Sequence, residues 1–322
     1  MEQRRLGRSG LTVSRLGLGT MTWGRDTDEH EAADQLSMFL EAGGTLLDTA
    51  AGYGDGESER VIGGLLASKV DREEVVLATK AGVSRRTGVR VVDTSRRALL
   101  DALDGSLHRL GTDHVDLWQV HAWSDGTPLE ETLSAVDAAV TSGRARYAGV
   151  SNYSGWQTGR AVTWQEAWPG RARIVSTQME YSLLQRGVER EVLPAAEALG
   201  LGVLPWSPLG AGVLTGKYRG GTPADSRAAS PHFARFIERF LDDRCRRIVD
   251  AVATAADGLD VAPLEVALAW VRDAPGVTAP IVGARTAAQL RASLDAESLI
   301  LPAEIRGALD EVSAPPTGYP DG

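Results

Sequence analysis

The segment TLLDTAAGYGDGESERVIGGLLASKVDREEVVLATK (residues 45–80) indicates how the whole chain folds. It begins with the apolar run Thr45–Thr49, continues through an amphipathic stretch, and ends with the apolar run Val75–Thr79 followed by Lys80. Short apolar runs that alternate with amphipathic stretches are typical of parallel strands joined by crossover helices. We therefore read residues 45–80 as one strand–helix–strand unit.

The same alternation continues over most of the 322 residues. The candidate strands are Val13–Leu18, Thr45–Thr49, Val75–Thr79, Val115–Val120, Tyr147–Val150, Ile174–Gln178, Val203–Trp206 and Pro280–Val282. This number of strands predicts an α/β fold, a (β/α)8 TIM barrel, formed by one domain over residues 1–322. A turn around Gly7–Gly10 predicts an N-terminal β-hairpin, and the Gly, Pro and Ser-rich stretch Ser207–Pro231 predicts a long loop at the C-terminal face.

Helical periodicity is strongest between the fourth and fifth of these runs. The apolar stripe there consists of Leu129, Leu133, Val136 and Val140, at steps of four, three and four. Thr127, Pro128 and Glu130 predict a capping box with proline in the first turn, and Gly143 can end the helix. These apolar residues belong to the core and carry no chemistry.

Composition excludes several classes of protein. Hydrophobic residues make up 43% and charged residues 24% of the chain, as in ordinary globular proteins. The net charge of -9 argues against general nucleic-acid binding, which needs a basic face. No apolar run approaches the ~18 residues of a membrane span, and the single cysteine, Cys245, has no partner for a disulfide or a metal pair. We expect a soluble cytoplasmic protein without a metal ion, with a flexible tail over Ala314–Gly322.

Four polar residues follow separate candidate strands. Asp48 closes the run that starts at Thr45, Tyr53 lies in the next loop, Lys80 follows Val75–Thr79, and His121 follows Val115–Val120. In a parallel barrel the loops after the strands converge at one face, where active sites lie. Singly, each residue has an ordinary structural explanation, as a cap, as rim packing or as a buried core histidine. Together and in this order they predict one catalytic site.

Eight ordered motifs connect these residues to a known family. They are Leu47-Asp48-Thr49-Ala50, Gly52-Tyr53-Gly54 with Ser58-Glu59, Ala78-Thr79-Lys80, Val115-Asp116-Leu117-Trp118-Gln119-Val120-His121, Gly149-Val150-Ser151-Asn152-Tyr153, Gln178-Met179-Glu180-Tyr181, Trp206-Ser207-Pro208-Leu209 and Gly283-Ala284-Arg285-Thr286. Over nearly its full length the chain resembles the aldo-keto reductases, and it is closest to their bacterial and potassium-channel-β-like branch. The resemblance implies NAD(P)H-dependent reduction of aldehydes and ketones to alcohols.

The resemblance also implies a role for each of the four residues. Tyr53 is the general acid, Lys80 lowers its pKa, Asp48 holds Lys80 by an ion pair, and His121 orients the substrate carbonyl. A cation ~4 Å from a phenol is worth about 4 kcal/mol at an effective dielectric near 20, so Lys80 alone could lower the pKa of Tyr53 by about two units.

The cofactor implied by the resemblance is a nicotinamide dinucleotide that lies across the barrel mouth. Trp206 stacks on the nicotinamide, while Ser151, Asn152 and Gln178 hold its carboxamide. The loop with Ser207, Leu209, Gly210, Gly212 and Lys217 covers the pyrophosphate. The remaining predicted cofactor contacts are Gly19, Thr20, Met21, Asp48, Pro208, Gly283 and Ser293. Core packing for Trp206 and Gln178, and a solvated charge for Lys217, are the competing interpretations.

Arg285, Thr286 and Gln289 could hold a 2′-phosphate at a helix amino terminus, which favours NADPH over NADH. The alternative is a plain Thr286 cap beside an unrelated arginine. Residues 210–216 do not have the spacing of a Rossmann fingerprint. Where the family often has Glu-Asn near the adenine, this chain has Ala292-Ser293, which leaves the adenine contacts open.

Aromatic residues are expected to wall the substrate pocket. Trp23, Trp123 and Tyr53, with Tyr181 and His121 nearby, suit apolar or aryl aldehydes and ketones, although the tryptophans could equally be barrel-rim packing. The partner is a small carbonyl compound; the oligomeric state, the physiological substrate and the preferred direction stay open.

Two other functions compete with carbonyl reduction. The chain could be a cofactor-binding regulatory subunit, as among channel-associated relatives in the family, but it retains all four catalytic residues. Alternatively, Lys80 could form a Schiff base as in barrel aldolases. Asp48 beside it argues against this, because an ion pair raises the lysine pKa and suppresses the free amine.

Overall fold

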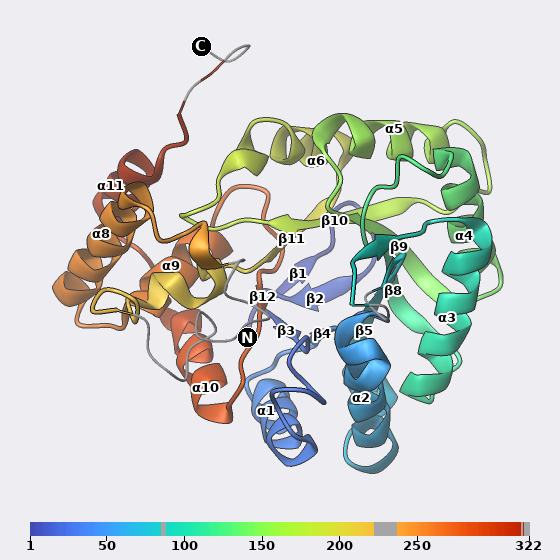
Figure 1. Cartoon of the computed structure of the whole chain (residues 1–322), viewed down its shortest axis with the longest axis horizontal. Helices are drawn as coiled ribbons and strands as arrows, with labels where there is room; N and C mark the ends of the chain where they lie inside the picture. Colours follow the sequence, from blue (N-terminus) through green and yellow to red (C-terminus); the bar gives the residue numbers. More distant parts are fainter. Residues whose placement is uncertain (85–87, 222–236, 317, 319–322) are drawn as a thin grey trace.

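The chain forms a closed barrel of eight parallel strands in the computed structural model, which describes residues 1–84, 88–221, 237–316 and 318 (Figure 1). The strands are β3 (Gly17–Gly19), β4 (Leu46–Asp48), β5 (Val76–Ala81), β8 (Val115–Val120), β9 (Ala145–Ser151), β10 (Ile174–Glu180), β11 (Gly202–Trp206) and β12 (Ile281–Val282). Around the barrel their order is β10-β11-β12-β3-β4-β5-β8-β9. The predicted (β/α)8 architecture is confirmed.

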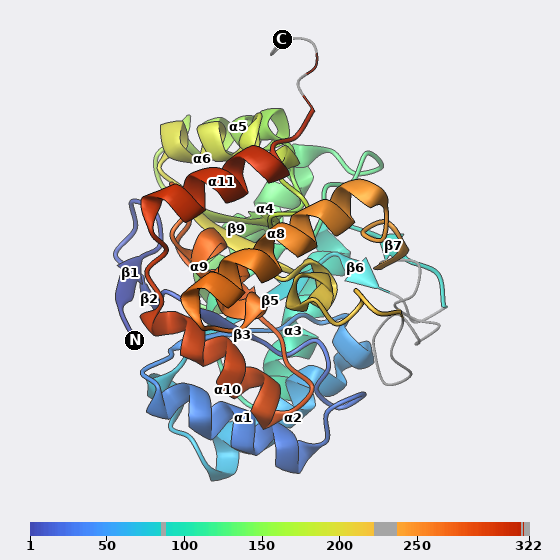
Figure 2. The same cartoon turned by 90° about the vertical axis from the view of Figure 1, so that its left-hand side faces the viewer.

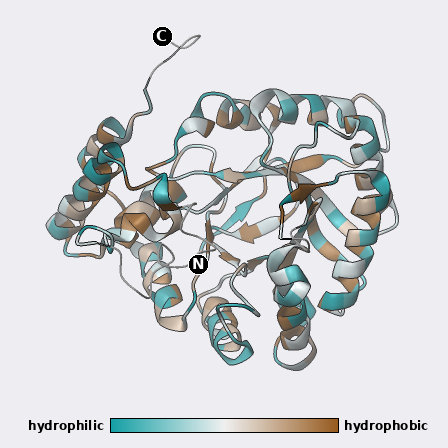
Figure 3. Cartoon of the chain, viewed as in Figure 1, coloured by the Kyte–Doolittle hydropathy of each residue, from teal (hydrophilic) through white to brown (hydrophobic). Residues whose placement is uncertain are grey.

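Helices surround the strands on all sides (Figure 1). They are α1 (Glu29–Glu41), α2 (Glu57–Ser68), α3 (Arg96–Leu110), α4 (Leu129–Thr141), α5 (Gly155–Glu166), α6 (Val192–Leu199), α8 (Asp243–Leu259), α9 (Pro263–Arg272), α10 (Ala287–Asp295) and α11 (Ala303–Ser313). Short 3-10 turns are η1 (Tyr53–Gly56), η2 (Arg72–Glu74), η3 (Gly187–Glu189), η4 (Gly210–Thr215) and η6 (Ala296–Ser298). Hydrophilic and hydrophobic residues alternate along the helices (Figure 3), so each helix buries one stripe against the barrel.

The start of α4 differs from the sequence prediction. The helix begins at Leu129 and its N-cap is Pro128, in an extended conformation and without a side-chain cap. Thr127 lies one residue too early to cap, so the predicted capping box is wrong. The predicted stripe is correct, since Leu129, Leu133 and Val136 are buried.

The apolar run Val13–Leu18 is not one strand. It divides into β2 (Thr12–Ser14), which pairs antiparallel with β1 (Gln3–Arg5), and the barrel strand β3. The side chain of Ser14 causes the division, because its hydroxyl donates to Leu16 O at 2.7 Å and accepts from Thr45 N at 2.9 Å. The predicted N-terminal hairpin is thereby confirmed, and its second strand takes the first part of the run.

The hairpin β1–β2 covers the amino ends of the barrel strands, which we call the floor. Figure 2 shows it at the opposite end of the molecule from the small hairpin of β6 (Val83–Ser84) and β7 (Val91–Val92). An apolar cluster fills the interior beneath it: Leu6, Val13, Leu46, Ala78, Leu117, Leu204, Ala279 and Ile281. Both hairpin residues in this list lack exposed surface. The floor is therefore closed, and ligands reach the barrel from the carboxyl ends, which we call the mouth.

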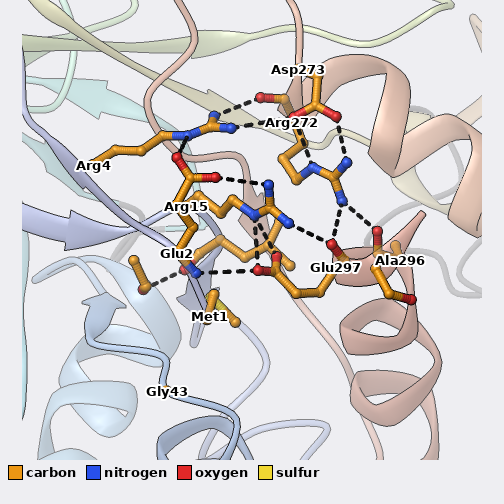
Figure 4. Close-up of polar contacts among 12 residues, drawn as sticks. Met1, Glu2, Arg4, Arg15, Gly43, Arg272, Asp273, Ala296 and Glu297 are labelled. Carbon is orange, nitrogen blue, oxygen red and sulfur yellow. Dashed lines mark hydrogen bonds and ion pairs between the residues drawn. The ribbon is translucent and has the colours of Figure 1, made fainter. Parts of the chain in front are cut away.

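Ion pairs join the hairpin to the C-terminal helices at the floor (Figure 4). Arg272 is buried and donates to the carbonyl oxygens of Ala296, Glu297 and Leu299 and to the carboxylate of Asp273. Arg15 Nε lies 2.8 Å from Glu297 Oε2. The contact between Arg15 and Glu297 connects residues 282 positions apart in the sequence, so it fixes both ends of the chain to the same face.

Parts of two predictions fall outside the described residues. They are residues 222–231 of the predicted long loop and residues 317 and 319–322 of the predicted flexible tail. Within the described part of the loop, the chain forms the turn η4. Across residues 1–84, 88–221, 237–316 and 318, none of the helices is both long and apolar enough to cross a membrane.

Candidate active site

Lys80 is the centre of a buried polar cluster at the mouth. Its Nζ donates to Asp48 Oδ1 at 2.6 Å, to Thr49 O at 2.8 Å and to the Tyr53 hydroxyl at 3.3 Å. Three acceptors use all three N–H groups of an ammonium. Lys80 and Asp48 are 1% and 2% exposed, whereas Tyr53 is partly exposed. Of these three side chains, Tyr53 is thus the one that is partly exposed at the mouth.

Tyr53 and His121 meet above this lysine. Their rings are 6.0 Å apart between centroids and nearly perpendicular, at 81°. Main-chain bonds fix the segments that carry them, since Tyr53 N donates to Ala50 O at 3.0 Å and His121 N donates to Ala81 O at 2.8 Å. The structure brings all four predicted catalytic residues to one place.

The charge state of Lys80 follows from its surroundings. Burial is the largest single effect and lowers the pKa of Lys80, but Asp48 and Tyr53 together outweigh it, and the net pKa lies above the ordinary lysine value. The side chain stays an ammonium at neutral pH. A charged amine is not a nucleophile, so the cluster does not support Schiff-base chemistry at Lys80.

Tyr53 departs from the sequence prediction. Burial raises the pKa of Tyr53 above its ordinary value; the charge of Lys80 lowers it, and Asp48 raises it again. Lys80 acts in the predicted direction and lowers the pKa of Tyr53, but desolvation of the phenol and the charge of Asp48 together exceed this effect, so the net pKa is raised. Tyr53 therefore holds its proton at neutral pH, as a general acid must.

Two of the three predicted carboxamide-binding residues are hydrogen-bonded to the Lys80 cluster or to His121, and the third, Ser151, accepts from Asn152 Nδ2 at 3.0 Å. Gln178 Nε2 donates to Asp48 Oδ2 at 2.8 Å. Asn152 Nδ2 donates to His121 O at 2.9 Å, and Asn152 Oδ1 accepts from Trp206 Nε1 at 3.1 Å. The orientation of the Asn152 amide is fixed by chemistry, because a main-chain carbonyl only accepts and an indole only donates. One amide thus links the main chain of His121 to the indole of Trp206.

The loop after β11 contains several residues in the left-handed conformation. Ser207, Gly210, Ala211 and Gly212 have left-handed φ values of 52°, 54°, 57° and 91°. Turns of this kind direct successive N–H groups to one side and bind anions. A Cβ built on Gly212 would lie 3.0 Å from Lys217 Nζ, so the ammonium rests directly on this loop. Lys217 thus brings a positive charge to the predicted pyrophosphate-binding segment, whereas the N–H groups of Gly210 and Gly212 already donate to Ser207 O and Leu209 O.

The expected 2′-phosphate site lies at the start of α10. Thr286 caps the helix by accepting from Gln289 N at 3.3 Å, and Arg285 N donates to Gln289 Oε1 at 3.0 Å. The carboxylate of Glu31, from α1, accepts from Ala287 N in the first turn. Sequence reasoning missed Glu31, because nothing in the sequence relates residues 256 positions apart.

The other predicted cofactor residues divide into mouth and interior positions. Met21 is 36% exposed. Gly19 is the last residue of β3, and Gly283 directly follows β12. Thr20 is fully buried, and its hydroxyl contacts Asp48 O at 3.1 Å. Ser293 is 7% exposed and donates to Gln289 O at 3.1 Å. Thr20 and Ser293 therefore hold local structure, and Pro208 and Leu209 belong to the turn before η4.

Two predicted substrate-wall residues are core residues. Trp23 has no exposed surface and donates from Nε1 to Gln35 at 3.1 Å, and Tyr181 is 2% exposed with its hydroxyl on Glu189. A side chain without exposed surface does not line an open pocket. Trp123 keeps some exposure and lies 5.3 Å from the ring of Trp156, a 58% exposed residue that sequence reasoning missed.

Comparisons with known proteins identify the family of the chain. The model of the Aldo/keto reductase family matches residues 15–314. The chain is 40% identical to "Uncharacterized oxidoreductase YrpG" of Bacillus subtilis, over 99% of this chain and 98% of that protein. It is 36% identical to "Probable voltage-gated potassium channel subunit beta" of Oryza sativa, over 93% and 92%, and 33% identical to "Protein tas" of Escherichia coli, over 97% of each. With its closed barrel and this arrangement at the mouth, the chain belongs to the aldo-keto reductase family.

Proposed function

We propose that this protein reduces aldehydes and ketones to alcohols with NADPH, and that Tyr53 is the general acid. One observation carries the proposal: Lys80 Nζ lies 3.3 Å from the Tyr53 hydroxyl and 2.6 Å from Asp48 Oδ1. A phenol held by an ammonium at an open barrel mouth can donate to an oxygen that gains negative charge.

Each residue of the cluster has a separate task in this proposal. A bound reduced nicotinamide supplies the hydride. Tyr53 gives its proton to the carbonyl oxygen, and Lys80 stabilises the phenolate that remains, because the ammonium already points at that oxygen. His121 donates a hydrogen bond to the same carbonyl oxygen and orients it. Asp48 keeps Lys80 charged and in place, so Asp48→Asn misplaces the ammonium.

The nicotinamide would lie on Trp206, which Asn152 holds in position. Gln178 has a second amide hydrogen and a carbonyl oxygen besides the bond to Asp48, so it can still bind the carboxamide. Lys217 and the loop Ser207–Gly212 would hold the pyrophosphate. Arg285 supports a preference for the 2′-phosphate of NADPH, whereas the carboxylate of Glu31 at the same helix start opposes it.

The proposal is tested by following the absorbance of the reduced nicotinamide while aryl and alkyl aldehydes and ketones are added. We expect turnover with an aryl aldehyde and with NADPH, and weaker binding of NADH in a titration of tryptophan fluorescence. A protein that binds NADPH yet reduces none of the carbonyl compounds contradicts the proposal.

A regulatory subunit is the second candidate, because a relative of similar sequence is described as a probable potassium channel β-subunit. The experiment above separates the two, since turnover by the isolated protein requires no partner. The expected small-molecule substrate, the cytoplasmic location and the single domain stay predictions.

A further inference from the structure

The pair Ser58-Glu59 lies in the first turn of α2, directly after the turn that carries Tyr53. Both side chains are fully buried although one is a carboxylate. Neither belongs to the cluster that surrounds Lys80. A buried carboxylate is costly unless it is paired and hydrogen-bonded, so its partners show what it does.

Glu59 binds three groups from two other elements. Its Oε1 accepts from Thr79 Oγ1 at 2.6 Å, and its Oε2 accepts from Arg109 Nε at 2.8 Å and lies 2.7 Å from Arg109 Nη2. Thr79 lies in β5, next to Lys80, and Arg109 lies at the end of α3. The carboxylate therefore holds α2 to the strand that carries the lysine.

Arg109 also touches the turn of Tyr53 directly. A Cβ built on Gly56, the last residue of η1, would lie 2.7 Å from both Arg109 Cδ and Arg109 Nε. Gly56 has a φ of 97°, which glycine adopts without strain. Arg109 thus packs against the backbone of this turn, while Glu59 fixes the helix that follows it.

Ser58 makes the matching contacts to β3 and β4. Its hydroxyl donates to Thr20 O at 2.8 Å and lies 2.9 Å from Thr49 Oγ1. Thr49 O is the acceptor of one of the three Lys80 bonds. The start of α2 is therefore bonded to β5 and to the residues that directly follow β3 and β4, beside the Lys80 cluster.

We propose that Glu59, held by Arg109, is a positioning residue that sets the distance between the Lys80 ammonium and the Tyr53 hydroxyl. It acts through Thr79 on the lysine strand and through α2 on the tyrosine turn. The kinetic part of this inference rests on the proposed function, whereas the part that concerns the pKa of Tyr53 does not. A rival explanation is that the Glu59–Arg109 pair only docks α2 against α3.

Thr79→Val tests the inference, because valine keeps the β-branched shape and removes the hydroxyl that binds Glu59. Thr79→Ser keeps the hydroxyl and is the matched rescue. Asp116→Asn is the control: Asp116 Oδ2 accepts from Arg72 at 2.7 Å and from Leu77 N at 2.8 Å, so it also joins an arginine to β5, but towards the floor. All three proteins are compared by urea unfolding, NADPH binding and the pKa of Tyr53.

The pKa of Tyr53 is measured in the cofactor-free protein by ¹³C NMR of labelled tyrosine, with Tyr53→Phe to assign the signal. Lys80, Asp48 and His121 are the groups that face this hydroxyl or ring. If Thr79→Val moves the ammonium away, the pKa should rise by about half a unit or more. Carbonyl reduction should slow about ten-fold with the same NADPH affinity, and Thr79→Ser should restore both.

Asp116→Asn should lower stability and leave both the pKa of Tyr53 and the reduction rate unchanged. The inference is overturned if Thr79→Val loses stability as Asp116→Asn does while the pKa of Tyr53 stays at the parent value. If the parent protein reduces no carbonyl compound, the proposed function fails, but the pKa comparison still decides the role of Glu59.

Discussion

At the mouth of the barrel a buried cation, Lys80, is enclosed by Asp48, Thr49 and Tyr53, whereas at the floor a buried cation, Arg272, is enclosed by Asp273 and main-chain carbonyls. Both cations are about 1% exposed, and each has a carboxylate partner. They differ in one acceptor, because Lys80 also donates to the Tyr53 hydroxyl, whereas Arg272 donates to carbonyl oxygens instead. A carbonyl oxygen cannot give up a proton, so the floor contact only holds the chain together, whereas the phenol at the mouth can react.

The mouth also keeps more of its backbone in uncommon conformations. Asn152, Ser207 and Ala211 have left-handed φ values at the mouth, although none of them is a glycine. Such positions cost free energy and persist only where the surrounding structure holds them. The floor instead consists of an apolar cluster covered by a hairpin and by ion pairs (Figure 4). We infer that the floor stabilises the barrel and the mouth uses part of that stability.

Tyr53→Phe gives the largest effect that we expect, and it separates the two ends. The ring stays, so packing and cofactor binding should persist, but no proton reaches the carbonyl oxygen. Reduction should fall by about 10³-fold to 10⁴-fold. The measurement is the turnover of an aryl aldehyde at saturating NADPH, with cofactor affinity measured separately. A variant that turns over as fast as the parent protein means that Tyr53 is not the acid.

Arg272→Met should lower the stability of the fold and leave the reduction rate unchanged. Methionine fills part of the volume but removes the hydrogen bonds to Asp273 and to three carbonyl oxygens, although Asp273 keeps Arg4 and Glu297 O keeps Arg15. Unfolding should therefore become easier by about 3 kcal/mol. The activity per folded molecule should not change. Urea unfolding and active-site titration measure the two quantities. A large loss of activity in protein that is still folded would show that the two ends are not independent.

The pKa of Tyr53 and its effect on stability give a third prediction. Burial raises the pKa of Tyr53 above about 10, its ordinary value. The folded state therefore favours the protonated form, and the stability that this contributes is present below pH ~10 and is lost as the pH rises through the folded pKa. An NMR titration of labelled tyrosine in the cofactor-free protein measures the pKa of Tyr53. A Tyr53 pKa clearly below the ordinary value contradicts our explanation.

Glu31→Gln should have the smallest effect. It removes a negative charge from the start of α10 but keeps a side-chain oxygen that can accept from Ala287 N. Affinity for NADPH should rise a few-fold relative to NADH, since one charge near a helix terminus is worth about 0.3–1 kcal/mol. Fluorescence titrations of the parent protein and the variant with each cofactor measure the ratio of NADPH affinity to NADH affinity. An unchanged ratio would place the 2′-phosphate away from this helix.

Local sequence patterns predicted most of the barrel correctly. Val115–Val120 has the same bounds as β8, because an apolar run with clear ends leaves little choice of register. The run Val13–Leu18 was misread, since the hydroxyl of Ser14 breaks the strand and no apolar pattern reveals that. Asp48, Tyr53, Lys80 and His121 could be predicted to lie together because strand ends in a parallel barrel converge.

Other features depend on contacts between distant residues and on burial. The Glu59–Arg109 pair joins positions 50 residues apart, and the contact of Glu31 with α10 spans far more of the chain. The effect of Lys80 on the pKa of Tyr53 was predicted in the right direction, but the larger opposing effect of burial cannot be read from the sequence. Trp23 and Tyr181 were expected to line a pocket, but aromatic residues near strand ends can point either way, and these two point into the core.

The most direct test of hydride transfer at this mouth uses NADPH that carries deuterium on the transferable position of C4. The product alcohol is examined by mass spectrometry after reaction with an aryl aldehyde, with the parent protein and with Tyr53→Phe. We predict one deuterium on the carbinol carbon of the product formed by the parent protein and almost no product from the variant. An alcohol without deuterium, or equal product from both proteins, would contradict the account.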